Sequence, residues 1–259
     1  MESSGKKFKF IGCEIVYREA CLLAARSPHK IDVEFLRKGL HDLETHEMLG
    51  KIQACVDAVD ASAGYDAILL GYARCNDGVV GLTARGIPLV IPRAHDCITF
   101  FFGSRGAFRE YFDANPGTYY MTTGWAERSD ADDGQHATPA YGKQGVMGKL
   151  GLAQSREELI AKYGLENADY IMSTLGDWTK NYSNLLYLKM GVCDETPHID
   201  QARARAQEHN WSFDLQEGSW SLLEKLFGGA WDDDFVILQP GQKLEARNDE
   251  RVLDKSGDP

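Results

Sequence analysis

Three cysteines and two histidines lie where predicted β-strands end. The strand-like runs cover residues 8–12, 31–36, 67–71 and 88–91, and the residues that follow them are Cys13, His41, Cys75, and His95 with Cys97. In an open α/β sheet, ligands bind beyond the carboxyl ends of parallel strands, so these side chains are expected to converge. Thiolate and imidazole groups are the ligands that zinc prefers. The pattern predicts a metal or thiolate site.

The predicted metal ligands are Cys75 and Cys97, with either Cys13 or His41 as the further ligand. Catalytic zinc commonly takes three protein ligands and leaves one position open for a thiol or water. The sequence has no Cys-x-x-Cys pair, so such a site depends on the fold to bring its ligands together. The alternative is that these cysteines are small buried core residues, which is common for reduced cysteine.

The other three cysteines have simpler explanations. Cys21 and Cys55 lie inside amphipathic segments, where packing accounts for them. Cys193 follows a predicted strand at 185–190 but lies in a short loop, and we predict no role for it.

The segment from Arg93 to Cys97 is dense in functional groups. Arg93 could pair with a substrate carboxylate, and Asp96 could orient a metal ligand. Asp96 could equally cap a helix that begins at Ile98. A cysteine at a helix start has a lowered pKa, so Cys97 is the candidate reactive or metal-bound thiolate, and Asp96 and Cys97 are candidate catalytic residues.

Further candidates lie after other strands. Glu14 is a candidate acid or base, or else a helix-start carboxylate. Thr122, Thr123 and Trp125 follow a predicted strand at 119–122 and would give a substrate pocket hydroxyls and an aromatic wall, although Trp125 could equally be a core residue. Arg105 lies in a Gly-Ser-Arg-Gly turn suited to an anion. The sequence has no dinucleotide-binding fingerprint, P-loop or Gly-x-Ser-x-Gly motif.

Strand-like and helix-like segments alternate along the chain, which predicts an α/β fold with a mostly parallel, doubly wound, Rossmann-like sheet. Strands are predicted at 8–13, 31–36, 67–71, 88–91, 119–122, 185–190, 211–215 and 235–238. Helices are predicted at 17–25, 43–59, 79–84, 98–112, 155–163, 167–175, 199–208 and 219–226.

Two α/β halves with a cleft between them are a further expectation. Residues 1–125 form the half with the Cys/His site, residues 126–150 a glycine-rich loop or lid, residues 151–241 the second half, and residues 242–259 a polar, solvated tail.

Composition narrows the class of partner. The net charge of −11 disfavours nucleic acid, which needs clustered basic side chains. No apolar run has the length of a transmembrane helix or the form of a signal peptide, so we expect a cytoplasmic protein with reduced thiols. A small-molecule substrate is the expected partner, without nucleic acid or membrane, and a homo-oligomer is left open.

Several of these motifs together resemble the uncharacterised bacterial and archaeal family called domain of unknown function 1638. They are Gly12-Cys13-Glu14, Gly39-Leu40-His41, Leu70-Gly71-Tyr72 with Cys75, Pro92-Arg93 with Asp96-Cys97, Gly103-Ser104-Arg105, and Tyr120-Met121-Thr122 with Gly124-Trp125. The resemblance covers nearly the whole chain. It departs at Tyr72-Ala73, where the family often has Tyr-Gly.

Members of that family are similar in genomic setting to partners of corrinoid-dependent methyltransferases, which implies one-carbon metabolism by association. Zinc activates the thiol in enzymes that move methyl groups between corrinoids and thiols, so the resemblance fits a zinc or other transition-metal site. The chain has no Asp-x-His-x-x-Gly motif, so a partner protein would carry any corrinoid. The leading hypothesis is a metal-thiolate protein of methyl or one-carbon transfer, with a zinc-dependent methyltransferase as the candidate enzyme class. The alternatives are a non-catalytic metal, cofactor or corrinoid-protein accessory, and a metal-free enzyme with Cys97 as nucleophile.

Overall fold

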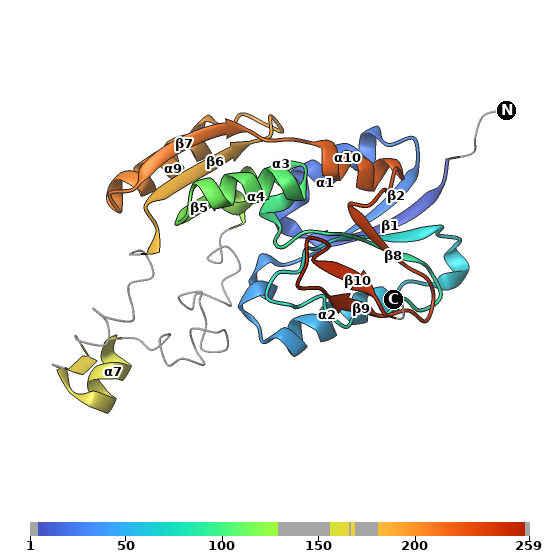
Figure 1. The fold of residues 1–259 in the computed structure, drawn as a ribbon, viewed down its shortest axis with the longest axis horizontal. Coiled ribbons are helices and arrows are strands. Elements are labelled where there is room, and N and C mark those ends of the chain that lie inside the picture. Colours follow the sequence, from blue (N-terminus) through green and yellow to red (C-terminus); the bar gives the residue numbers. More distant parts are fainter. Residues whose placement is uncertain (1–4, 129–155, 166, 169–180, 257–259) are drawn as a thin grey trace.

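The computed structural model describes residues 5–128, 156–165, 167–168 and 181–256, without the side chains of residues 41–42 and 156–159. The described strands form a five-stranded sheet, a three-stranded sheet and a two-stranded hairpin. Figure 1 shows the three-stranded sheet with its helix α9 at one end of the molecule and the five-stranded sheet at the other.

The five-stranded sheet has the order β2-β1-β3-β4-β8. Its strands are β2 (Lys30–Leu36), β1 (Lys7–Cys13), β3 (Ala67–Gly71), β4 (Leu89–Pro92) and β8 (Phe235–Leu238). The first four are parallel, and β8 is antiparallel to β4. Every residue of β3 and β4 is buried, as expected for parallel strands that are covered on both faces.

The three-stranded sheet consists of β5 (Thr118–Met121), β6 (Asn184–Lys189) and β7 (Ser212–Glu217), all parallel. Helix α9 (Thr196–Glu208) packs on β6 and β7. The predicted α/β class with a mainly parallel sheet is therefore confirmed. The predicted domain boundaries stay a prediction, but strands from both sides of them share sheets, because β5 pairs with β6 and β4 pairs with β8.

Most predicted helices are present: α1 (Tyr17–Arg26), α2 (Thr45–Asp57), α7 (Arg156–Tyr163), α9 and α10 (Ser221–Gly228). The predicted helix at 98–112 is instead two helices, α3 (Ile98–Phe102) and α4 (Arg105–Ala114). The break is at Gly103, whose φ of 75° is left-handed, and the hydroxyl of Ser104 then caps α4 by accepting from the amide of Ala107.

Two further predictions were wrong. Residues 79–84 are not helical: turns run from residue 75 to 81, and Thr83 forms an isolated bridge with Lys243. Within the predicted solvated tail, β9 (Leu244–Ala246) and β10 (Leu253–Lys255) form an antiparallel hairpin, with Leu244 and Leu253 buried in the main core. The few apolar residues of this segment are enough to anchor it. The predicted helix at 167–175 and the predicted lid at 126–150 lie mostly outside the described residues.

Candidate functional site

The thiols of Cys75 and Cys97 are in contact, with the two sulfurs 3.4 Å apart. Cys75 lies just beyond β3 and Cys97 just beyond β4, so the predicted convergence of the two residues at one sheet edge is confirmed. Backbone hydrogen bonds hold the two segments together, from the amide of Arg74 to the carbonyl of Ala94 and from that of Cys75 to the carbonyl of His95. Both cysteines are buried.

Cys13, at the end of the neighbouring strand β1, lies close enough for its charge to raise the pKa values of Cys97 and Tyr72. The pKa of the Cys97 thiol lies well above its ordinary value, first because of its hydrogen bond with Cys75 and next because of burial. The lowered pKa expected for Cys97 at a helix start is therefore wrong. Helix α3 has only five residues, and Asp96 accepts hydrogen bonds from the amides of Ile98 and Thr99 at its start.

The two arginines that were predicted to bind substrate, Arg93 and Arg105, contact the C-terminal part of the chain. The buried guanidinium of Arg93 donates to the carbonyl of Leu253 and pairs with the carboxylate of Asp254 at 3.4 Å. Arg105 donates to the carbonyls of Glu250 and Asp233 and pairs with Asp234. Both side chains are engaged with the protein itself, which gives them a structural role that the sequence analysis did not predict.

Four other candidates lie after β1 and after β5. Glu14 accepts a hydrogen bond from the amide of Lys38. Thr122 caps α5 (Thr123–Glu127), and the hydroxyl of Thr123 lies 3.1 Å from that of Tyr187. The indole of Trp125 donates to the hydroxyl of Tyr119. Substrate binding by these residues stays a prediction. The side chain of His41 lies outside the described part of the chain.

Helix α5 packs directly on η1 (Glu14–Val16), the short 3-10 turn that joins β1 to α1. A Cβ on Gly124 would come within 1.8 Å of the carbonyl oxygen of Ile15, so only glycine permits this approach. The contact brings α1 of the first sheet next to α5, which follows β5 of the second sheet.

A cluster of ligand-type side chains lies at this contact. The ligand atoms of Glu127, Cys193 and His198 all lie within 4.8 Å of one another. Among the described residues, this is the one group of three His, Cys, Asp or Glu side chains that lie close enough to hold a metal ion. Glu127 ends α5, Cys193 lies in the loop after β6, and His198 lies in the first turn of α9. The Nε2 atom of His198 is 3.5 Å from a Glu127 oxygen. We call these three residues the Glu-Cys-His cluster.

Arg18 of α1 reaches into the cluster. Its guanidinium donates three hydrogen bonds to the two carboxylate oxygens of Glu127, at 2.5 to 2.9 Å. These bonds hold the pKa of Glu127 below its ordinary value. Burial raises the pKa of the Cys193 thiol, so this thiol carries a proton at neutral pH that a metal ion would displace.

Glu19, one residue further along α1, is fully buried with a relative exposure of 0%. Neither of its carboxylate oxygens has a hydrogen-bond partner. Burial raises its pKa to about 7, and the charges of Glu195 and Glu127 add to this rise. Its own charge raises the pKa of Cys193, which places it beside the cluster. A buried carboxyl without a partner is costly and marks a site where a cation or a proton is expected.

A buried hydrogen-bond network holds the loop that carries Cys193. The carboxylate of Glu195 accepts from the amides of Met190 and Gly191 through one oxygen, and from the hydroxyl of Tyr187 through the other. Tyr187 in turn contacts Thr123 of α5. The loop position is therefore fixed by backbone and side-chain bonds to β6 and α5.

No role was predicted for Cys193 from the sequence, and Glu19, Glu127 and His198 were not among the predicted site residues. The strand-end rule that selected Cys13 and Cys75 also applies to Cys193 and His198, which follow β6, and would have found them. Nothing local in the sequence indicated Glu127 or Glu19, because their positions depend on the packing of α5 against η1.

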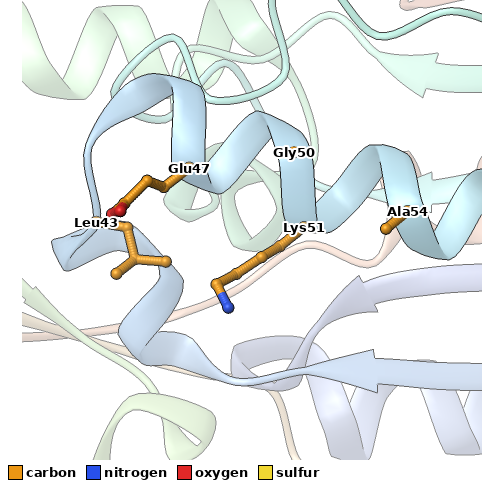
Figure 2. Close-up of a pocket in the computed structure, with 5 residues that line it drawn as sticks. All are labelled: Leu43, Glu47, Gly50, Lys51 and Ala54. Atoms are coloured by element: carbon orange, nitrogen blue, oxygen red, sulfur yellow. The ribbon is translucent and has the colours of Figure 1, made fainter.

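A shallow hollow lies on the exposed face of α2, apart from the Cys75–Cys97 pair and from the Glu-Cys-His cluster. Figure 2 shows Glu47 and Lys51 beside it, and its lining residues are Leu43, Glu47, Gly50, Lys51 and Ala54. None of these residues belongs to the cysteine pair or to the Glu-Cys-His cluster.

Among the described residues, no helix has both the length and the apolar character needed to cross a membrane. The sequence pattern of the family described as "Protein of unknown function (DUF1638)" matches residues 35–227. No curated protein and no solved structure gave a match.

Proposed function

The chain belongs to the DUF1638 family, whose description assigns no activity, and we propose that it is a zinc-type metal-thiolate protein of methyl or one-carbon transfer with its metal at the Glu-Cys-His cluster. The observation that carries the metal site is the approach of one carboxylate, one thiol and one imidazole to within 4.8 Å, next to the partnerless carboxyl of Glu19.

The donor set fits a transition metal. Zinc binds carboxylate oxygen, thiolate sulfur and imidazole nitrogen at about 2.0 to 2.3 Å, so the three ligand atoms need to move only slightly to surround one ion. When bound there, a zinc-type ion would supply Lewis-acid activation of a thiol or water at its open fourth position. Glu127 would share its carboxylate between the ion and Arg18.

The neighbouring residues suit a reaction that generates or consumes charge. Glu19 has a pKa of about 7, so it can hold or release a proton near neutral pH. The side chain of Arg18 is partly exposed to solvent and is also bonded to Glu127, so its guanidinium can orient an anionic group of a substrate. Because Glu127 is a proposed metal ligand, this bond would hold that anionic group next to the metal.

The one-carbon part of the proposal draws on the genomic setting that the family resemblance implies. The reaction would pass a methyl group from a corrinoid carried by a partner protein to a thiol, breaking the carbon–cobalt bond and forming a carbon–sulfur bond while cobalt keeps the electron pair. The metal-free alternative with Cys97 as nucleophile is disfavoured, because the raised pKa of Cys97 leaves little thiolate at neutral pH.

Metal analysis of the full chain, purified without chelators and then titrated with Zn²⁺ and Co²⁺, tests the site. We expect one equivalent of metal and a thiolate-to-cobalt charge-transfer band. Both should be lost in Cys193→Ser and His198→Ala and retained in the matched controls Cys21→Ser and His46→Ala. Metal that is instead lost in Cys75→Ser and Cys97→Ser would contradict the proposed location.

Methyl transfer is tested separately with methylcobalamin as donor and a small thiol as acceptor. We expect the loss of methylcobalamin absorbance to require the metal and to slow in Arg18→Gln. A chain that binds a corrinoid protein tightly but gives the same rate with and without metal would be an accessory, and the catalytic proposal would be wrong.

A further inference from the structure

The contact between Cys75 and Cys97 lies outside the Glu-Cys-His cluster and needs its own explanation. We propose that these two cysteines form a reversible disulfide, so that the chain carries a redox-active thiol pair at the carboxyl ends of β3 and β4. The proposal does not rest on the metal site, since the two groups share no residue.

The distance supports a disulfide. The two sulfurs are 3.4 Å apart, and a disulfide needs them at about 2.05 Å, so a shift of little more than 1 Å closes the bond. All six cysteines of the chain are reduced in this structure, and this pair is in thiol–thiol contact.

The backbone around the pair is already fixed in place. The amides of Arg74 and Cys75 bond to the carbonyls of Ala94 and His95 at 2.9 and 3.0 Å. Asn76 and Asp77, directly after Cys75, both have left-handed φ values, of 52° and 55°. Such strained residues persist where their surroundings hold them, and here the hydroxyl of Thr45 donates to the carbonyl of Asn76. The thiols are therefore held face to face without a covalent bond.

Burial limits the oxidants that can reach the pair. The relative exposure of Cys75 is 9% and that of Cys97 is 5%, so a small uncharged oxidant such as hydrogen peroxide is the class that fits, and we take the more exposed Cys75 as the first residue to react. The Cys75 thiolate would attack a peroxide oxygen and break the O–O bond, giving a sulfenic acid and a hydroxide ion, which takes up the proton lost by the Cys75 thiol to form water. The Cys97 sulfur would then attack the Cys75 sulfur to form the disulfide, and the leaving hydroxide would combine with the Cys97 proton as a second water.

Peptide mapping of the folded full chain tests the pair. After treatment with hydrogen peroxide and alkylation of the remaining thiols, trypsin releases Cys75 in residues 75–85, Cys97 in residues 94–105 and Cys13 in residues 10–18. We expect a cross-linked product of the first two peptides with a loss of two hydrogen atoms, and its removal by dithiothreitol. The control variants Cys55→Ser and Cys193→Ser should give the same product.

Three results would overturn the proposal. One is alkylation of Cys75 and Cys97 in the peroxide-treated protein as complete as in the reduced protein. Another is a link that forms only after the chain is unfolded in urea. The third is a link from the 10–18 peptide in place of one of the two. Because the measurement uses the unmodified chain, it does not depend on a variant that folds poorly.

Discussion

The guanidinium of Arg18 holds the carboxylate of Glu127 through its Nε atom at 2.7 and 2.9 Å, although the two residues are 109 positions apart in the sequence. This pair joins the first helix of the five-stranded sheet to the helix that follows β5 of the three-stranded sheet. It also engages both oxygens of the carboxylate that Arg18 and the proposed metal would share, so Arg18 weakens the hold of Glu127 on the metal.

Replacing Arg18 with glutamine should therefore tighten Zn²⁺ binding. The change frees the Glu127 carboxylate and removes a positive charge next to the ion, and we expect the Kd to fall about fivefold, corresponding to about 1 kcal/mol of relieved repulsion. Competition titration with a chromophoric chelator measures the Kd for Zn²⁺. Arg203→Gln, which removes an exposed pair with Asp200 on α9, is the control. Weaker binding in Arg18→Gln than in the control would contradict this effect of Arg18.

The buried carboxyl of Glu19 should make stability depend on pH. Its folded pKa of about 7 lies above the ordinary value of 4.5, so the folded protein holds this proton more tightly than the unfolded chain. The stability that comes from this tighter proton binding is fully present below pH 4.5 and is lost as the pH rises through about 7. Glu19→Gln should thus raise the free energy of unfolding by about 3 kcal/mol at pH 8 and change it little at pH 4. Urea unfolding at the two pH values measures this, with the exposed Glu47→Gln as control, and an equal change at both pH values would refute it.

The network around Glu195 should support the metal site through the loop that carries Cys193. Tyr187→Phe removes the hydroxyl that donates to Glu195, and we expect a loss of about 1 to 2 kcal/mol in the free energy of unfolding because a buried acceptor loses its donor. Zn²⁺ affinity should fall with it. Tyr65→Phe, whose hydroxyl donates to Asp32 at the surface, is the comparison. Unchanged Zn²⁺ affinity in Tyr187→Phe would show that the hydrogen bonds around Glu195 do not support metal binding.

Arg93 should matter for stability and not for the chemistry. Arg93→Met leaves the buried carboxylate of Asp254 with the half-exposed Arg251 as its remaining ion-pair partner, beside the backbone amide of Lys255, and we expect a loss of about 3 kcal/mol in the free energy of unfolding. Arg251→Met should cost about 1 kcal/mol or less. Metal content and methyl-transfer rate, measured below the melting transition, should equal those of the parent. A selective loss of substrate affinity in Arg93→Met would restore its predicted role as a substrate-binding residue.

Oxidation of the Cys75–Cys97 pair should stabilise the fold. The link closes a loop between residues 22 positions apart, for which the loss of chain entropy in the unfolded state gives about 3 kcal/mol. Urea unfolding of the peroxide-treated chain should show a higher midpoint than that of the reduced chain, and dithiothreitol should reverse the difference. A lower midpoint after oxidation would mean that the disulfide distorts the fold.

The strands were predictable because their signals are local. Residues 67–71 and 235–238 were predicted as strands with the bounds that the structure has, since each is a short apolar run between turn residues. The direction of β8 was not predictable, because pairing with β4 depends on contacts far along the sequence. The helix expected at 98–112 shows a similar limit: its apolar spacing continues through Gly103 and hides the break.

The site was predictable only in part. The rule that ligands gather at the carboxyl ends of parallel strands brought Cys75 and Cys97 together correctly. It was not applied to Cys193, and it could not reveal Glu19, whose burial follows from the packing of α1. Arg93 was expected at a substrate because it lies beside these strand ends, and Arg105 because it lies in a Gly-Ser-Arg-Gly turn. In the structure, Arg93 pairs with Asp254 of the segment that had been expected to be a solvated tail, and Arg105 pairs with Asp234 just before β8.

The antiparallel pairing of β8 with β4 also has a consequence for synthesis. Ile68 and Leu69 of β3 pair with Leu89 and Val90 on one side of β4. The other side of β4 pairs with residues 235–238, which are synthesised much later. As the ribosome makes the chain from the amino terminus, the nascent amino-terminal sheet keeps an open hydrogen-bonding edge on an apolar strand until about residue 238 has emerged. Such an edge invites pairing with other chains. Chaperones that shield this edge from other chains would therefore raise the yield of folded protein, and a chain that stops before residue 235 would be prone to aggregate.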